Sequence, residues 1–142
     1  MIKTLVAPEV LEWTNSLTLY NDKLDEQHKE LFDLINQIIT QERIEPMSED
    51  FAIILSKISD YGLEHFKTEE KLMQDLNYPH LDKHRKEHRE YIYHVALFNT
   101  NFKCKNYTEP AKVVKFVKGW WYWHIMMQDL DLASYIREKL ID

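Results

Sequence analysis

Apolar side chains recur at steps of three and four residues along most of the chain, the spacing typical of amphipathic helices. This pattern is interrupted at Arg43-Ile44-Glu45-Pro46, at Asn77-Tyr78-Pro79 and before Pro110. Ser48 is suited to cap the second helix, and Pro110 suits the first position of the fourth. On the fourth helix, the apolar face includes Met127, three residues after His124. The predicted helices cover residues 22–42, 48–76, 80–104, 109–128 and 130–141.

Four long helices joined by short connections favour an all-α, up-down-up-down four-helix bundle. The pattern places this bundle at residues 22–128, with a short C-terminal helix at 130–141. Residues 1–20 show no clean period, and we expect an ordered N-terminal arm packed on the bundle. The 142 residues are then one domain, residues 1–142.

Composition narrows the class further. Two glycines and four prolines are too few for the many tight turns of a sandwich or barrel. A net charge of -6 argues against a nucleic-acid partner, and no apolar run is long enough for a membrane span. The single cysteine, Cys104, cannot form an internal disulfide, and the start of the chain lacks a signal-peptide pattern. We therefore expect a cytoplasmic protein.

Histidines occupy core positions on the same apolar stripes. An unpaired buried imidazole costs about 1–3 kcal/mol and an unpaired carboxylate costs more, so several such groups would consume much of a domain's stability. The helix stripes contain six of these polar residues: His28, His65, Glu69, His84, His88 and His124. Something must satisfy them together.

Their heights in the bundle agree when residues are counted from each connection, at about 1.5 Å per residue. The pairs that match within about one turn are His28 with His65, Glu69 with His84, and His88 with His124. The same count places His80 near the end of the bundle. His94 lies six residues after His88, about 120° off the stripe, and we expect it on the surface or flank.

Five imidazoles and at least one carboxylate exceed the four ligands of a structural zinc, so the pattern predicts two metal ions in the bundle core. Nitrogen-rich ligation with a bridging carboxylate suits iron, while manganese and zinc remain open. Asp129 lies five residues after His124, about 140° away on an ideal helix. It reaches the same site only if the helix ends or widens there. The plainest alternative is a metal-free bundle with hydrogen-bonded core histidines.

The motifs resemble those of the hemerythrins, among them the single-domain bacterial type, from Trp13 to about Leu132. The matching segments are Asp25-Glu26-Gln27-His28-Lys29, His65-Phe66-x-x-Glu69-Glu70, Tyr78-Pro79, His84-x-x-x-His88, and Trp120 with His124-Ile125-x-x-x-Asp129-x-x-Leu132. The resemblance implies a non-haem di-iron centre with an oxo or hydroxo bridge. By analogy, His84, His88 and His124 hold one iron, His28 and His65 hold the other, and Glu69 and Asp129 bridge both.

Two positions depart from the family pattern. Trp121 stands where many members carry a leucine that lines the dioxygen pocket, and its indole either narrows this pocket or points elsewhere. Leu19-Tyr20-Asn21 stands where relatives often have valine and glycine, and we expect a changed arm conformation.

The resemblance implies reversible dioxygen binding for storage or delivery, with an oxygen-consuming enzyme as recipient and no catalytic activity of its own. A second hypothesis is an oxygen or redox sensor or an interaction module. A third is a di-iron oxidase, or an enzyme that handles peroxide or nitric oxide. Such enzymes are typically richer in carboxylates, whereas the predicted ligands here are five histidines and two carboxylates.

Overall fold

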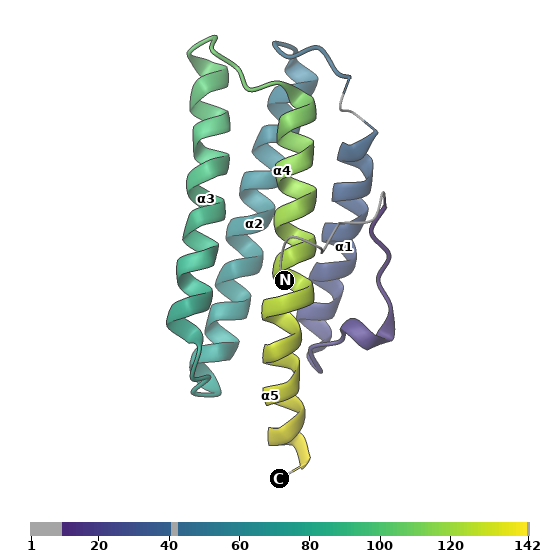
Figure 1. Ribbon diagram of the computed structural model, residues 1–142, viewed down its shortest axis with the longest axis vertical. Coiled ribbons are helices and arrows are strands. Elements are labelled where there is room, and N and C mark those ends of the chain that lie inside the picture. The colour runs from purple at the N-terminus through teal and green to yellow at the C-terminus, as the bar shows by residue number, and fades with distance from the viewer. Residues whose placement is uncertain (1–9, 41–42, 142) are drawn as a thin grey trace.

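The computed structural model describes residues 10–40 and 43–141, and its regular elements in this part of the chain are all helical. Four long helices run up, down, up and down, which confirms the predicted all-α bundle (Figure 1). The elements in order are η2 (Asn15–Leu17), α1 (Asp22–Ile39), α2 (Glu49–Asp75), α3 (Leu81–Lys103), α4 (Pro110–Trp123), η3 (His124–Asp129) and α5 (Leu130–Ile141).

The helix starts follow from local chemistry. The side chain of Ser48 caps α2 as predicted, with its hydroxyl oxygen accepting from the Phe51 amide at 3.1 Å. The side chain of Asn21 caps α1 in the same way, accepting from the Leu24 amide at 3.0 Å. At the start of α4, Pro110 occupies a first-turn position, where its missing N–H costs nothing.

Two apolar clusters form the interior. The main apolar core fills the bundle above the middle and includes Phe51, Ile58, Tyr91, Val117 and Trp121. A smaller group, the lower apolar cluster, lies at the opposite end of the bundle, where α5 packs against it. Its buried members are Leu19, Leu24, Met73, Tyr78, Leu132, Ala133 and Ile136. The buried histidines and carboxylates lie between these two apolar clusters along the helices.

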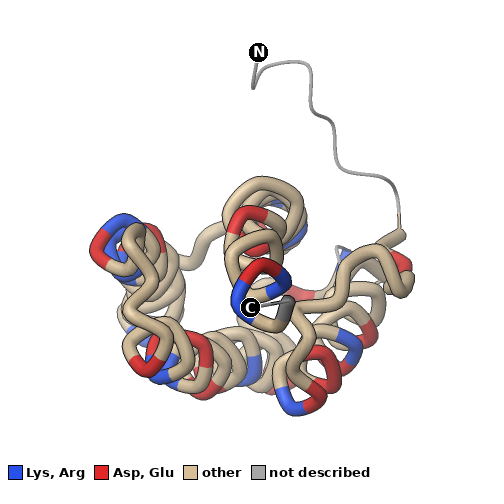
Figure 2. The backbone as a smooth tube through the Cα atoms, turned by 90° about the horizontal axis from the view of Figure 1, so that it is seen from below, with Lys and Arg blue, Asp and Glu red and all other residues tan. Residues whose placement is uncertain are grey.

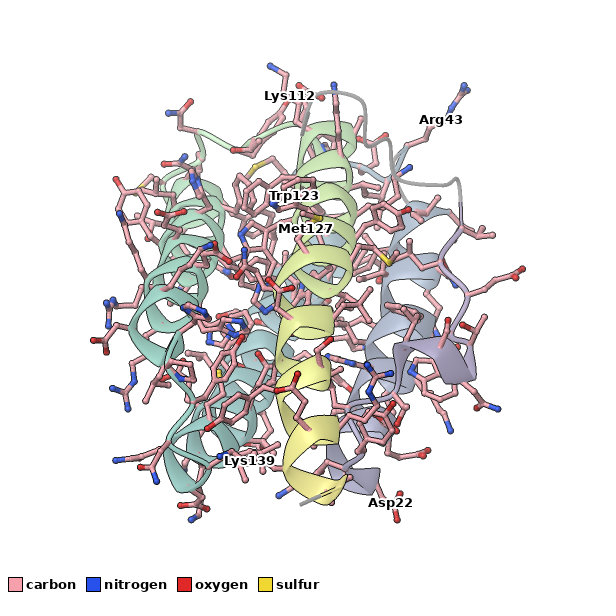
Figure 3. The ribbon with its side chains drawn as sticks, turned by 60° about the horizontal axis from the view of Figure 1, so that its bottom comes forward. Asp22, Arg43, Lys112, Trp123, Met127 and Lys139 are labelled. Carbon is pink, nitrogen blue, oxygen red and sulfur yellow. The ribbon has the colours of Figure 1, made fainter. Side chains whose placement is uncertain are left out.

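The C-terminal helix continues the fourth helix without a break. α4 passes through the π-helical segment η3 directly into α5, which extends beyond the bundle end (Figure 1). The sequence pattern placed Met127 on the buried face of this helix, and that prediction is wrong. The Met127 side chain is 43% exposed, because the wider turn of η3 rotates it off the stripe that His124 follows (Figure 3).

The N-terminal arm packs on α1 over residues 10–20, as predicted; residues 1–9 lie outside the described residues. The side-chain amide of Asn36 donates to the Leu11 carbonyl and accepts from its amide, each at 2.8 Å. Leu17 and Leu19 are buried. Tyr20 adopts φ 56°, a left-handed conformation that favours glycine, so this tyrosine accepts backbone strain of about 1–2 kcal/mol.

Charged residues of both signs are interspersed along the helices, as the view along the bundle shows (Figure 2). Among the described helices, none combines the length and apolar character needed to cross a bilayer.

Candidate metal centre

Seven buried titratable side chains meet in the middle of the bundle. None is more than 2% exposed. They are His28 from α1, His65 and Glu69 from α2, His84 and His88 from α3, and His124 and Asp129 from η3. Figure 3 shows ring nitrogens gathered between the helices at this level. The structure therefore brings together all seven residues that the sequence analysis proposed. His94 is exposed, as predicted, and His80 is an exposed residue at the start of α3, near the bundle end.

The seven residues form two overlapping groups, each with ligand atoms within 4.8 Å of one another. The three-histidine group contains His84, His88, His124 and Glu69, and the two-histidine group contains His28, His65, Glu69 and Asp129. In the first, the Nε2 atoms of His88 and His124 are 3.2 Å apart. In the second, the Nε2 atoms of His28 and His65 are 3.0 Å apart. Each group has the size of a single-ion site.

Glu69 and Asp129 each direct one oxygen to each group. Glu69 Oε1 lies 3.3 Å from His88 Nε2, while Oε2 lies 3.2 Å from His65 Nε2. Asp129 Oδ1 lies 3.3 Å from His124 Nε2, while Oδ2 lies 3.2 Å from His28 Nε2. This is the arrangement that a carboxylate bridging two cations requires.

The π-helical turn explains how Asp129 reaches the site. An α-helix would direct residues five apart to different faces, whereas i→i+5 hydrogen bonding adds a residue to the turn. The six residues of η3 run from His124 to Asp129, so the widened segment begins and ends on the two metal-ligand candidates. The helix widens where the sequence analysis required it to end or widen.

The donor set fits cations. Among the described residues, none forms a hydrogen bond to any of the four carboxylate oxygens of Glu69 and Asp129, although all four are buried. Two buried carboxylates without donors are costly, and several imidazole nitrogens face them. Burial alone would raise the pKa of Glu69, but the four surrounding histidines hold it well below its usual value. Burial likewise opposes charge on His124, yet Asp129, Glu69 and Glu87 raise its pKa well above the usual value.

Several histidines are oriented by a second hydrogen bond, which the sequence analysis missed. His88 Nδ1 donates to Glu70 Oε2 at 2.7 Å, and His84 Nε2 donates to the backbone carbonyl of Gln128 at 3.2 Å. His65 Nδ1 lies 3.0 Å from Gln27 Oε1. Glu70 and Gln27 both belong to the motifs that carry the resemblance, but residue spacing alone does not say which ring nitrogen they meet.

Aromatic side chains close the apolar side of the centre. Trp121 is fully buried, stacks on Phe66 with ring centroids 5.1 Å apart, and presents an edge to His65 at 5.6 Å. Trp120 stacks on His124 at 4.6 Å. Of the alternatives left open for Trp121, the structure supports the one in which its indole lies against the centre.

Comparisons with known proteins agree with this geometry. A family model described as the hemerythrin HHE cation binding domain matches residues 20–136. A bacteriohemerythrin of Stenotrophomonas maltophilia is 23% identical over 92% of this chain and 84% of its own length. A bacteriohemerythrin of Campylobacter jejuni is 27% identical over 87% of this chain and 92% of its own length. A hemerythrin-like protein of Naegleria gruberi is also 27% identical, over 87% of this chain and 91% of its own length.

A solved structure gives the same result for the fold. A crystal structure of a hemerythrin with a leucine replaced by tyrosine superposes with a TM-score of 0.80 at 25% identity. The alignment covers 91% of this chain and 98% of that one.

Proposed function

Because the chain belongs to the hemerythrin family and is of the bacteriohemerythrin type, we propose that it binds dioxygen reversibly at a two-iron centre, for storage or delivery. The observation that carries this proposal is that a three-histidine group and a two-histidine group share two buried carboxylates, to which no described residue donates a hydrogen bond. One iron would be held by each group, with Glu69 and Asp129 common to both.

The unequal groups leave room for a ligand on one side only. The group of His28 and His65 would offer an ion fewer protein ligands than the other group, so dioxygen would bind on this side. A pair of ferrous ions held at the centre would supply the two electrons that dioxygen takes up. Iron also fits the mixture of imidazole and carboxylate donors.

The side chains around this position would keep binding reversible. Trp121 and Phe66 place apolar rings against His65 of the two-histidine group and would keep water from this side of it, water being the source of protons that drives oxygen chemistry onward. The indole Nε1 of Trp121 has no hydrogen-bond partner within the part of the chain that is described. The same tight packing disfavours a second substrate, so we propose a binding protein rather than an enzyme, with an oxygen-consuming enzyme as recipient.

The direct test is iron analysis combined with absorption spectra under nitrogen, in air, and again under nitrogen. We expect about two irons per chain and a charge-transfer band that appears with oxygen and bleaches on its removal. Absence of iron would refute the proposal. Steady-state consumption of peroxide or nitric oxide, with a band that does not bleach, would favour the di-iron enzyme instead.

A further inference from the structure

Each of the five histidines has one ring nitrogen that faces away from the centre, here called the outward nitrogen. The partners of these nitrogens differ between the three-histidine and the two-histidine group, the two halves of the centre. A metal-ligating histidine uses one ring nitrogen for the metal, and the partner of the other nitrogen tunes its strength as a ligand. The shared carboxylates direct one oxygen to each half and so add equally to both. Differences between the halves therefore arise from the histidines and their outer partners.

Carboxylates face the outward ring nitrogens of two of the three histidines in the three-histidine group, whereas that of His84 donates to the neutral Gln128 carbonyl. His88 Nδ1 donates to Glu70 Oε2 at 2.7 Å, and the Arg85 guanidinium holds the other Glu70 oxygen at 3.4 Å. Glu87 Oε2 lies 3.6 Å from the outward Nδ1 of His124. An anion that accepts an imidazole N–H pushes electron density onto the metal-facing nitrogen, which strengthens the metal bond.

Among the described residues, the two-histidine group has one outer hydrogen-bond partner, the neutral side chain of Gln27. The Thr68 hydroxyl donates to the Glu64 carbonyl at 3.1 Å, so its oxygen accepts from Gln27 Nε2 at 3.2 Å. This fixes Gln27 Oε1 toward His65, whose Nδ1 must then carry the proton and whose Nε2 is free for metal. The outward Nδ1 of His28 has no hydrogen-bond partner in residues 10–40 and 43–141.

We propose that the two positions fill in order, the three-histidine position first, and that Glu70 and Gln27 act as positioning residues that set the gap between the two metal affinities. This inference rests on the two-metal centre of the proposed function. The third histidine by itself gives the three-histidine position the higher metal affinity. The contribution of Glu70 and Gln27 to the difference in affinity therefore has to be measured by changing these two residues alone.

Two substitutions alter the outer charge in opposite directions. Glu70→Gln keeps an acceptor for His88 but removes the charge. We expect the metal affinity of the three-histidine position to fall by about 10–100-fold. Gln27→Glu adds a carboxylate beside His65. We expect the metal affinity of the two-histidine position to rise by about tenfold. Gln27 lines a surface hollow of about 80 Å³ together with Glu30, Tyr61, Glu64 and His65, so the new carboxylate remains partly solvated.

The experiment is an equilibrium titration of the metal-free full chain with Co²⁺, followed by its visible absorption and by proton NMR. The imidazole N–H of His88 should show a paramagnetic shift with the first equivalent, and that of His65 with the second. Glu90→Gln is the matched control, because Glu90 is exposed on α3 and the charge change is the same. Far-UV circular dichroism of each metal-free variant checks that the bundle remains folded.

The outcomes separate this inference from the function on which it rests. If the wild-type chain binds no Co²⁺, the two-metal centre itself is wrong. If two ions bind but the two-histidine position fills first, the inference is overturned. It is overturned equally if folded Glu70→Gln and Gln27→Glu leave both metal affinities within about twofold of wild type, or if Glu90→Gln has the same effect as Glu70→Gln.

Discussion

The metal centre and the lower apolar cluster are equally buried but differ in what they need. Buried members of the lower cluster are at most 7% exposed and pack together mainly through apolar contacts. The seven centre residues are at most 2% exposed, yet the described chain offers the carboxylate oxygens of Glu69 and Asp129 no hydrogen bond. Burial therefore stabilises one region unaided, whereas the other is a cost that bound cations must offset.

The largest effect should come from metal removal, which changes the centre and leaves the lower apolar cluster intact. At free metal about 1,000-fold above Kd, each filled site adds about 4 kcal/mol to the free energy of unfolding. We therefore expect the loaded protein to melt more than about 10 °C above the metal-free chain. Differential scanning calorimetry with and without a chelator measures this, and equal melting temperatures would show that the buried histidines and carboxylates are self-sufficient.

Ile136→Ala changes the lower apolar cluster without touching the centre. Removing this buried side chain should cost about 2–5 kcal/mol, because a cavity replaces apolar contacts. The loss should be the same with and without metal, and the metal content should not change. Urea denaturation of both forms checks it. A loss that appears only in the loaded form would mean that the two regions are energetically coupled.

Trp121→Leu changes a side chain that belongs to the main apolar core and also contacts the centre at His65. We expect a loss of about 1–3 kcal/mol from the vacated volume. We also expect faster spontaneous oxidation of the oxygenated protein, because the space admits water beside His65. The decay of the oxygenated absorption band measures this rate. Trp13→Leu removes an indole of the N-terminal arm that packs on the main core, and it should leave the rate unchanged.

Tyr135→Phe tests the polar rim of the lower cluster and should have the smallest effect. The Tyr135 hydroxyl donates to the Leu76 carbonyl at 2.9 Å and ties α5 to the end of α2. Its loss should cost about 0.5–1.5 kcal/mol, because water replaces the donor at this half-exposed position. Chemical denaturation detects the change. A cost above about 3 kcal/mol would show that α5 depends on this single hydrogen bond.

Much of the fold followed from the sequence because it depends on local rules. Helical periodicity and the cap at Ser48 are encoded within a few residues, and both are present in the structure. The coincidence in height of His28 with His65, and of His88 with His124, followed from helix rise alone. These inferences require no knowledge of how the helices pack.

The parts that could not be predicted depend on a change of helix type or on tertiary contacts. Periodicity assumes a uniform α-helix, so it placed Met127 inside and left Asp129 conditional on a helix end or widening, and η3 altered both. Tyr20 keeps a left-handed backbone because Asp25 accepts from the Leu19 amide and the Thr18 hydroxyl around it. Spacing carries no information about such partners.

One extra residue in a helix shifts the phase of everything that follows by about 100°. The widened turn at His124–Asp129 therefore sets two things at once: the carboxylate delivered to the cations, and the face on which Leu132 and Ile136 seal the bundle end. Shortening this stretch by one residue would withdraw the bridge and turn the seal outward in the same step. A single change in the length of this segment would therefore alter both the candidate metal centre and the packing of the lower apolar cluster.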